Sequence, residues 1–283
     1  MFYDDGVRLA LSGLVLIAGC DQVYGLRGRG NGSDASVDEV DAPCTLGPFN
    51  GAEVFVHNGF PAGTYDPAMS SDGLEMFYVV QNVSLDLRYA NRPSREAPWT
   101  DGLDIANLND LAANDADPTI TADGLSLLFT STRAGGTPSR AVYEVVRDAG
   151  GTWSDPVRRM GIDVNAWSID ISADGTALFV MEGDLPASSL YRFKRTGIGK
   201  DFESRTEVGV GTRFPSVSAD ESELYFHDGE GVKRMINVSG AFVSPELVVP
   251  DEQDPDLSHD GMTLTFQIAN GIGYVKRACA TDQ

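Results

Sequence analysis

One short pattern occurs five times along the chain, and this repetition limits the fold more than any other feature of the sequence. In each copy a short apolar stretch is followed by Ser or Thr, one variable residue, Asp and usually Gly, and then by a second apolar stretch. Repeats spaced by 40 to 51 residues are typical of architectures in which each unit packs against its neighbours. The shared aspartates are Asp72, Asp123, Asp174, Asp220 and Asp260.

Each copy is predicted to supply four strands. The Asp-Gly pair provides positive φ angles and therefore predicts a hairpin between the first two strands. The fourth copy has Asp220-Glu221 at this place, and we expect a different turn type there. A third strand carries a Tyr and then a basic residue in four copies, and an aromatic residue leads the fourth strand. The Tyr and basic pairs are Tyr89 with Arg92, Tyr143 with Arg147, Tyr191 with Lys194, and Tyr274 with Lys276, and the leading aromatics are Trp99, Trp153, Phe202 and Phe242.

The fifth copy lacks the aromatic-led segment, because the chain ends soon after Tyr274. A matching segment, residues 49–56 with Phe49 at its start, stands before the first copy instead. Such a displaced strand is typical of a ring closed by pairing the two chain ends, which removes exposed sheet edges. The sequence therefore predicts an all-β, five-bladed β-propeller over residues 44–283, closed by an N-terminal strand in the last blade. Six blades stay as the alternative, because a degenerate blade fits within the first or second spacing.

The five segments resemble the TolB-like, WD-like β-propeller repeat, which runs roughly Pro-x-apolar-Ser-x-Asp-Gly-x-x-apolar-apolar-Phe. The resemblance covers about residues 45–280 and implies the propeller fold. It implies little about function, because one fold hosts many functions and the repeated residues are architectural. The periplasmic protein for which the family is named works through protein contacts at the cell envelope, and the resemblance extends that expectation to this chain.

The N-terminal residues predict export and lipid attachment. Residues 1–19 place a basic residue before a short apolar run, as in a signal peptide. The run ends in Leu-Ile-Ala-Gly-Cys, which resembles a bacterial lipobox with Cys20 as the acylated residue. Residues 20–43 are rich in Gly, Ser and Asp, and we expect them to be a flexible tether behind the lipid.

We therefore expect an exported, membrane-anchored lipoprotein that faces the periplasm or the cell surface, with the choice between inner and outer membrane left open. Asp4 and Asp5 depart from the basic start of an ordinary signal peptide, so the true translation start is also open. Cys44 and Cys279 flank the two ends of the predicted closing blade. In an oxidising compartment they are expected to form a disulfide, and two free thiols are the alternative.

Charge and motifs limit the function classes. The formal net charge of −21 repels phosphate backbones, so nucleic acid is not an expected partner. The sequence contains no metalloprotease, nucleophile-elbow or phosphate-loop motif. We therefore predict a protein that is not an enzyme, although carboxylates on different blades could assemble a hydrolase that the sequence does not reveal.

Three carboxylates are candidates for a binding site. Asp66, Asp117 and Asp254 begin the predicted innermost strand in three copies, where Ser168 and Phe214 stand in the other two. Innermost strands line the channel of a propeller, so these carboxylates are expected to converge at one mouth. They could hold a ligand or a hard cation such as Ca²⁺ or Mg²⁺; blade-capping hydrogen bonds are the alternative, and no cofactor is otherwise expected. The Asp of each Ser-x-Asp-Gly turn, in contrast, is predicted to be a turn former.

The leading functional hypothesis is a monomeric, non-catalytic envelope lipoprotein whose propeller binds a protein or peptide partner. The alternative is a carbohydrate-binding or carbohydrate-active propeller that uses the channel-mouth carboxylates together with aromatic residues such as Trp167.

Overall fold

In the computed structural model, the described part of the chain consists of strands, turns and loops. Among these residues there is no helical segment able to cross a bilayer. The predicted signal peptide, Cys20, the tether and Cys44 all lie outside the described part. The described residues are 46–49, 54–57, 59–60, 62–100, 102–105, 107–133, 139–183, 187–210 and 212–279.

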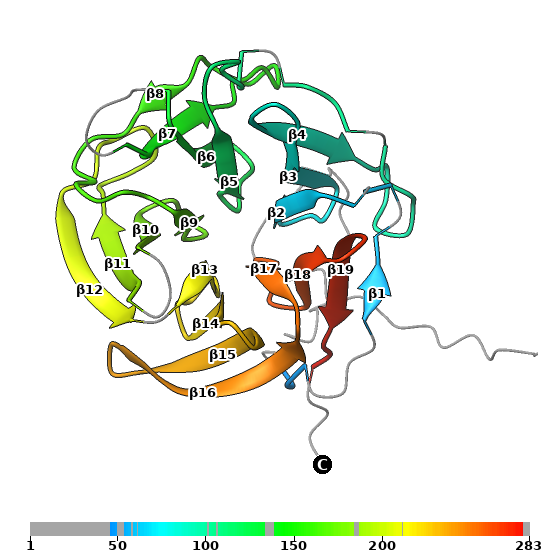
Figure 1. Ribbon diagram of the computed structural model, residues 1–283, viewed down its shortest axis with the longest axis vertical. Helices are drawn as coiled ribbons and strands as arrows, with labels where there is room; N and C mark the ends of the chain where they lie inside the picture. Colours follow the sequence, from blue (N-terminus) through cyan, green and yellow to red (C-terminus); the bar gives the residue numbers. More distant parts are fainter. Residues whose placement is uncertain are drawn as a thin grey trace, which may run out of the picture. The chain divides into compact units, whose positions relative to one another are not determined.

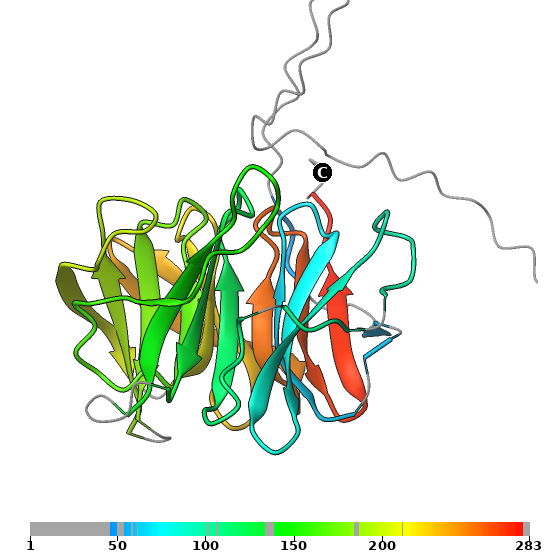
Figure 2. The same ribbon diagram turned by 90° about the horizontal axis from the view of Figure 1, so that it is seen from above.

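The strands form five antiparallel sheets, or blades, around a central axis (Figure 1). The innermost strand of each blade contacts the innermost strands of both neighbouring blades, so the ring is closed. This confirms the predicted five-bladed β-propeller. In the side view, turns and loops gather at the two ends of the blades (Figure 2).

The blades follow one another along the chain. Blade 1 has β2 (Thr64–Met69), β3 (Glu75–Gln81) and β4 (Leu85–Asn91); blade 2 has β5 (Asp115–Ile120), β6 (Ser126–Ser131), β7 (Ala141–Val146) and β8 (Val157–Arg158); blade 3 has β9 (Ser168–Ile171), β10 (Ala177–Glu182), β11 (Ser189–Lys194) and β12 (Ser204–Val210); blade 4 has β13 (Arg213–Val217), β14 (Glu223–His227), β15 (Gly231–Val238) and β16 (Ala241–Pro250); blade 5 has β17 (Gln253–Leu257), β18 (Thr263–Ile268), β19 (Gly271–Lys276) and β1 (Phe55–Val56).

The last blade is completed by the N-terminal strand, as predicted. β1 pairs antiparallel with β19, and further along the chain Leu46 pairs with Cys279 in an isolated bridge. Phe49 is only 4% exposed and packs edge-on against Tyr225 of blade 4. The Arg277 guanidinium lies over the Phe49 ring at 4.7 Å. Phe49 therefore supplies the leading aromatic residue that is missing after the third strand of the fifth copy.

The Asp of each repeat forms the turn between the first two strands, as predicted. In all five copies its carboxylate accepts the Ser or Thr hydroxyl two residues earlier, at 2.6–2.8 Å, and a backbone N–H two residues later. The expectation of a different turn in the fourth copy is wrong. Glu221 has φ 56°, close to the 69–71° of the corresponding glycines, and its N–H bonds to the Ser218 carbonyl as they do.

Blade 1 differs from the prediction of four strands. The described segment after Trp99 forms no strand; Leu103 instead pairs with Tyr89 through an isolated bridge. This segment contains Asp and Gly, which have low preference for extended strands. Trp99 is nevertheless buried and packs under the Arg92 guanidinium at 4.2 Å, so the aromatic keeps its packing role without a strand behind it.

The repeated Phe of each copy lies in the second strand and forms the core between blades. All five of these rings are at most 2% exposed, and each is surrounded by apolar side chains of its own or a neighbouring blade. Burial of one such ring contributes roughly 1.5–3 kcal/mol to stability. The five residues are Phe77, Phe129, Phe179, Phe226 and Phe266.

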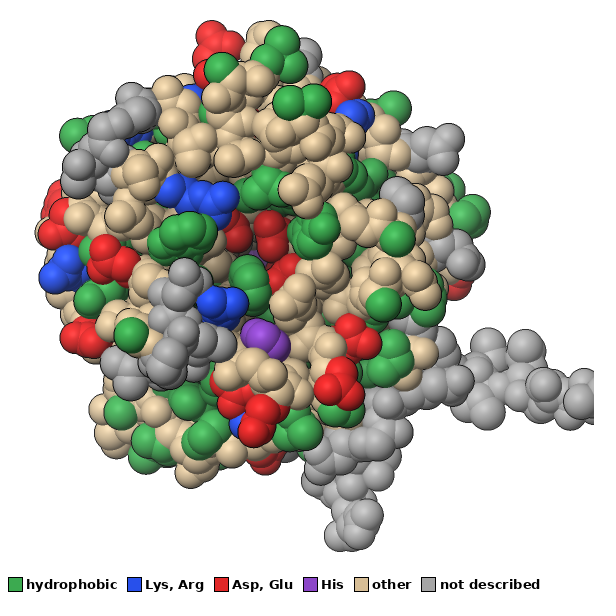
Figure 3. All heavy atoms as spheres, in the orientation of Figure 1, with side chains coloured by type: hydrophobic (Ala, Val, Ile, Leu, Met, Phe, Trp, Pro, Cys, Tyr) green, Lys and Arg blue, Asp and Glu red, His purple; other side chains and the backbone are tan. Residues whose placement is uncertain are grey.

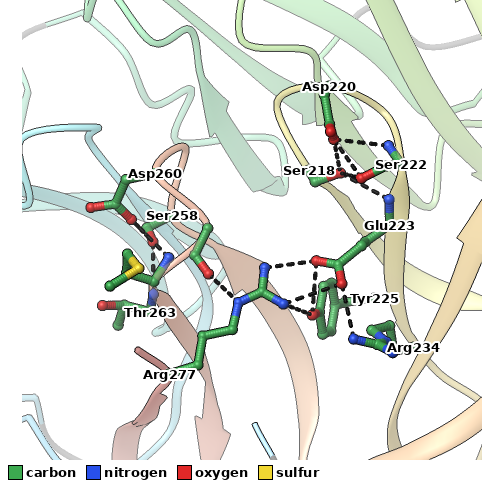
Figure 4. A network of polar contacts seen from close by, with 12 residues as sticks. Ser218, Asp220, Ser222, Glu223, Tyr225, Arg234, Ser258, Asp260, Thr263 and Arg277 are labelled. Carbon is green, nitrogen blue, oxygen red and sulfur yellow. Dashed lines mark hydrogen bonds and ion pairs between the residues drawn. The ribbon is translucent and has the colours of Figure 1, made fainter. Parts of the chain in front are cut away.

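Arginine–glutamate pairs connect neighbouring blades. In Figure 4, Arg277 of blade 5 points toward Glu223 of blade 4, and its Nη2 lies 2.7 Å from Glu223 Oε2. Arg277 also donates to the Tyr225 hydroxyl and to a turn carbonyl of its own blade. The planar guanidinium has five donors in a rigid fork, so it makes these contacts simultaneously and bonds to both oxygens of the Glu223 carboxylate. Equivalent pairs are Arg195 with Glu144 and Arg147 with Glu75. In blades 3 and 5 the bridging arginine directly follows Lys194 or Lys276, the basic residue of the repeated pattern.

Candidate functional site

The mouth of the central channel is built by an irregularity that recurs in four innermost strands. In β2, β5, β13 and β17 one extra residue interrupts the pairing with the second strand, which is a β-bulge. The bulge falls on a residue followed by Pro, which has no N–H that would remain unpaired. β9 has no Pro there and its pairing is regular. The bulged dipeptides are Asp66-Pro67, Asp117-Pro118, Phe214-Pro215 and Asp254-Pro255.

The bulge holds its first residue in the left-handed backbone region. The φ angles are 46° for Asp66, 49° for Asp117, 50° for Phe214 and 53° for Asp254. Residues other than glycine adopt this conformation at a cost in free energy, and such backbone strain is concentrated at functional sites. All four residues, together with Ser168 of β9, line a small cavity at the channel mouth.

The cavity has a volume of about 30 Å³, enough for a water molecule or one small polar group and too little for a sugar ring. Figure 3 shows acidic side chains at the centre of the ring, next to hydrophobic and basic ones. The structure therefore brings together the three carboxylates, Asp66, Asp117 and Asp254, that the sequence singled out. Their role as a binding site stays a prediction.

The three carboxyl groups are connected to one another. The Asp117 N–H donates to Asp66 Oδ2 at 3.4 Å, and the carboxyl groups of Asp66 and Asp254 hydrogen bond to each other. Asp117 Oδ2 accepts the Thr130 hydroxyl at 2.6 Å and lies 3.3 Å from Arg140 Nη1. Sequence analysis did not identify Arg140 or Thr130, which lie outside the repeated segments.

Burial and mutual repulsion favour the protonated forms of these groups. Burial, and then the nearby Asp254 charge, raise the pKa of Asp66 well above its usual value. Burial and the Asp66 charge raise the pKa of Asp117 to about 8, despite the opposing effect of Arg140. Burial raises the pKa of Asp254 to about 7. Asp117 and Asp254 therefore change their protonation state near neutral pH.

A second polar layer lies two residues further along the innermost strands. Here a side chain of one blade accepts a backbone N–H of the next blade, and we call this layer the inter-blade belt. Burial raises the pKa of both of its aspartates, Asp170 and Asp256, to about 7. The belt bonds are Ile171 N–H to Thr119 Oγ1 at 3.0 Å, Val217 N–H to Asp170 Oδ2 at 2.7 Å, Leu257 N–H to Ser216 Oγ at 2.8 Å and Met69 N–H to Asp256 Oδ2 at 2.9 Å.

The sequence contained a signal for this belt. The third residue of each repeated segment is Asp, Ser or Thr in four copies and Ala68 in the other. That residue lies on the innermost strand, with its side chain toward a neighbouring blade. A small polar residue that recurs at this position therefore indicates a structural hydrogen bond between blades. These carboxylates therefore belong to the architecture of the channel.

The mouth residues do not fit a divalent metal well. Among the described residues, no group of three or more Asp, Glu, His or Cys side chains has the arrangement of a metal site. The carboxylates of the mouth are instead engaged with each other, with Thr130 and with Arg140. Hard cations such as Ca²⁺ require six to eight oxygen ligands, a number that this small cavity does not assemble.

Exposed apolar side chains stand at the same end of the blades as the mouth. Val83 lies in the turn between β3 and β4, Leu111 precedes β5 and Trp167 precedes β9, and each of these segments adjoins the start of an innermost strand. Their side chains are 104%, 93% and 45% exposed. Arg140 extends over the Trp167 ring at 5.3 Å, which connects this aromatic to the carboxyl cluster.

A larger groove lies on blade 1 at this end of the molecule. It has a volume of about 710 Å³ and combines two tyrosines with amide and guanidinium side chains. Arg88 forms an ion pair with Asp104 at 2.8 Å beside it. No sequence pattern outside the repeats marked the residues of this groove. Its polar and aromatic lining residues are Tyr65, Tyr78, Gln81, Asn82 and Arg88.

Comparisons with known proteins agree with the architecture. No protein-family model and no curated protein sequence matches the chain. Among solved structures, TolB from Acinetobacter baumannii is 16% identical with a TM-score of 0.46, and the alignment covers 77% of this chain but only 55% of that one. A gluconolactonase from Xanthomonas campestris is 17% identical, with a TM-score of 0.47 and coverage of 82% and 80%. The calcium-binding protein regucalcin from Agrobacterium tumefaciens is 14% identical, with a TM-score of 0.51 and coverage of 82% and 96%. These similarities show the propeller fold alone.

Proposed function

We propose that this chain is a non-catalytic envelope lipoprotein whose propeller binds a protein or peptide at the end that carries the channel mouth. The proposal is carried by the three apolar side chains at that end, Val83, Leu111 and Trp167, of which two are fully exposed. Isolated exposed apolar residues are common, but Trp and other large apolar side chains beside charged ones are typical of protein interfaces. The acidic mouth next to them would favour a partner with basic residues.

The chemistry of the mouth supports binding in preference to catalysis. The described residues that line it include no His, Cys or Lys, so a nucleophile supplied or activated by one of these groups is absent from this lining. Its carboxyl groups bond to one another, to Thr130 and to Arg140.

Site-specific crosslinking tests this function. A photoreactive residue is placed at Trp167 on the mouth end, and in a second variant at the exposed Lys200, which follows β11 at the opposite end. Irradiation in intact cells should give one adduct of defined mass from position 167 and none from position 200, and the identified partner should bind the purified protein. Equal adducts at both positions, or none at 167, would contradict the proposal.

Export and anchoring complete the proposal. Cys20 carries the lipid, and the propeller then stands in the periplasm or at the cell surface as a monomer on the tether of residues 20–43. A Cys20→Ser variant is expected in the soluble fraction after cell lysis, whereas the unaltered chain sediments with membranes. Membrane recovery of the variant would contradict lipid anchoring.

Carbohydrate binding is a second candidate, and the groove on blade 1 is the observation that favours it. The channel mouth is too small for a sugar, whereas the groove has the size of a small-ligand site and offers tyrosine rings beside amide groups. A glycan array with the unaltered chain and with Tyr65→Ala tests this function. Binding that the substitution abolishes would favour the glycan over a protein partner.

A further inference from the structure

The channel mouth places three carboxyl groups beside a single guanidinium group. Asp66, Asp117 and Asp254 meet there, and the cation that contacts them among the described residues is Arg140, at 3.3 Å from Asp117. The hydrogen bond between the Asp66 and Asp254 carboxyl groups requires one proton. At pH values above about 8, the pKa of Asp117, this one proton leaves two negative charges facing one positive charge in a site that is largely removed from water. Such a site favours uptake of a further cation.

One oxygen of the Asp254 carboxyl group has no donor in the described part of the chain, although the Asp66 N–H and the Asp66 carboxyl group both bond to this carboxyl group. The residue is 4% exposed, it lines the cavity, and its Oδ1 atom is buried with no hydrogen-bond partner among the described residues. Buried carboxylate oxygens in folded proteins are nearly always bonded. The unsatisfied atom can therefore accept a hydrogen bond from a group that enters the cavity, either a water molecule or a donor of a ligand.

The backbone holds this acceptor in place. Asp66, Asp117 and Asp254 keep left-handed φ angles in spite of their side chains, and the Pro that follows each one fixes the bulge. The same conformation in blade 4 carries Phe214, which contributes an apolar wall to the cavity. The cavity, with a volume of about 30 Å³, thus has carboxyl groups in fixed positions on one side and an apolar side chain on the other.

We propose that the channel mouth is a socket for the ammonium group of a lysine side chain that belongs to the protein partner. This inference rests on the proposed function. An ammonium group has three donors and no acceptor, which suits Asp254 Oδ1 and the neighbouring carboxylates, and its methylene stem matches the Phe214 wall. An ammonium group does not need the complete shell of oxygen ligands that Ca²⁺ or Mg²⁺ requires. A guanidinium is broader and planar, and it is less suited to so small a cavity.

The test uses a lysine side chain without a partner protein. Nα-acetyl-lysine methylamide is titrated into the full chain at pH 8 and compared with the norleucine analogue, which has the same number of side-chain carbons but no ammonium group. Calcium chloride is titrated in a third arm. Binding is followed by isothermal calorimetry and by the carboxyl carbon signals of ¹³C-labelled aspartate. The variants are Asp254→Asn, which keeps the shape, and Asp155→Asn, an exposed carboxylate outside the cavity.

We expect millimolar binding of the lysine amide that is at least tenfold tighter than that of the norleucine analogue. Asp254→Asn should weaken it at least tenfold, whereas Asp155→Asn should leave it unchanged. Equal binding of both amides, or unchanged binding in Asp254→Asn, would overturn the socket. Tighter binding of calcium than of the lysine amide would replace it with an inorganic cation site. If Asp254→Asn fails to fold, the contrast between the two amides on the unaltered chain decides the question.

The socket and the proposed function fail in different ways. If the lysine amide does not bind but position 167 still crosslinks to a partner, the binding face stands and the socket is wrong. If the amide binds while position 167 gives no specific adduct, the cavity recognises ammonium groups but the protein-binding function is wrong.

Discussion

At the scale of the residue, a few left-handed backbone positions determine both the turns and the channel mouth. Glycines occupy the turn position in four repeats, and Glu221 adopts the same conformation in the remaining one, the fourth copy. The sequence reveals the glycines, but it does not reveal that Glu221 will accept this strain, because the surrounding hydrogen bonds decide the conformation there. The same holds for the three mouth aspartates, whose left-handed φ angles are imposed by the bulge and not by the preference of Asp for this conformation.

Gly124 has a φ of 69°, and a Cβ added there would meet no atom within 4 Å. A substitution at this position is therefore expected to act through backbone strain alone and not through a steric clash. Gly124→Ala should therefore lower the free energy of unfolding by about 1–2 kcal/mol, the cost of the left-handed conformation for an L-residue. Gly197 is a matched control, since it is equally open but has no positive φ in the range that disfavours side chains. Urea unfolding of both variants checks this, and an equal loss in Gly197→Ala would contradict the assignment to backbone strain.

The raised pKa of Asp256 makes stability depend on pH. Burial raises this pKa to about 7, whereas an unfolded Asp titrates near 4. Between these values the folded state keeps a proton that the unfolded state has lost, so stability falls as pH rises through this window, by at most about 1.4 kcal/mol per pH unit for one carboxyl. Asp256→Asn keeps an oxygen for the Met69 N–H and removes the titration.

Urea unfolding between pH 5 and 8 checks this prediction. The unaltered chain should lose stability with rising pH more steeply than Asp256→Asn does. Asp155→Asn, an exposed carboxylate, should keep the slope of the unaltered chain. Parallel curves for Asp256→Asn and the unaltered chain would show that Asp256 is already ionised in this range.

At the scale of the element, the strands follow from sequence pattern but the contacts between blades do not. The repeated Asp-Gly turn and the buried Phe of each copy were sufficient to predict hairpins and their core-facing side chains. The inter-blade belt needed three-dimensional information, because each bond joins residues 41 to 187 positions apart in the chain. The fourth strand of blade 1 was predicted wrongly, because the aromatic residue marks a packing position and not the strand itself.

Ser216 provides a direct test of the inter-blade belt. Its hydroxyl accepts the Leu257 N–H at 2.8 Å, and the residue is 2% exposed. Ser216→Ala leaves this buried N–H without an acceptor and should cost about 1–3 kcal/mol of unfolding free energy. Ser216→Thr keeps a hydroxyl, as Thr119 does at the same place in blade 2, and should cost clearly less. Slower amide exchange of Leu257 in Ser216→Thr than in Ser216→Ala would support the assignment, and equal exchange would refute it.

At the scale of the whole molecule, the repeat spacing and the displaced aromatic predicted a closed ring, with five blades favoured and six left as the alternative. The site was predicted less completely. The three mouth carboxylates were found because they recur at one repeat position, whereas Arg140 and Thr130 stand outside the repeat and the blade 1 groove depends on how loops meet. A periodic sequence thus reveals what the blades share, and a binding site depends largely on where they differ.

The ring closure leads to a final prediction about the two ends of the chain. Leu46 pairs with Cys279, and the Gly47 N–H bonds to the Ala278 carbonyl at 2.9 Å, so the segment that follows Cys44 runs antiparallel to the C-terminal segment. Cys44 itself lies outside the described residues. Cys44 stands two residues before Leu46 in the sequence, and we expect it to form a disulfide with Cys279. Such a bridge encloses most of the chain and should stabilise the closed ring by roughly 4–5 kcal/mol, less any strain.

Mass spectrometry of the exported protein, alkylated without reduction, should recover residues 44 and 279 in one linked peptide pair. Cys44→Ser and the double variant Cys44→Ser with Cys279→Ser should lower the thermal midpoint equally, because either one opens the same bridge. If both thiols react with the alkylating reagent in the exported protein, the closing blade is held by β1, Phe49 and Arg277 alone. Reduction of the unaltered chain would then leave its thermal midpoint unchanged.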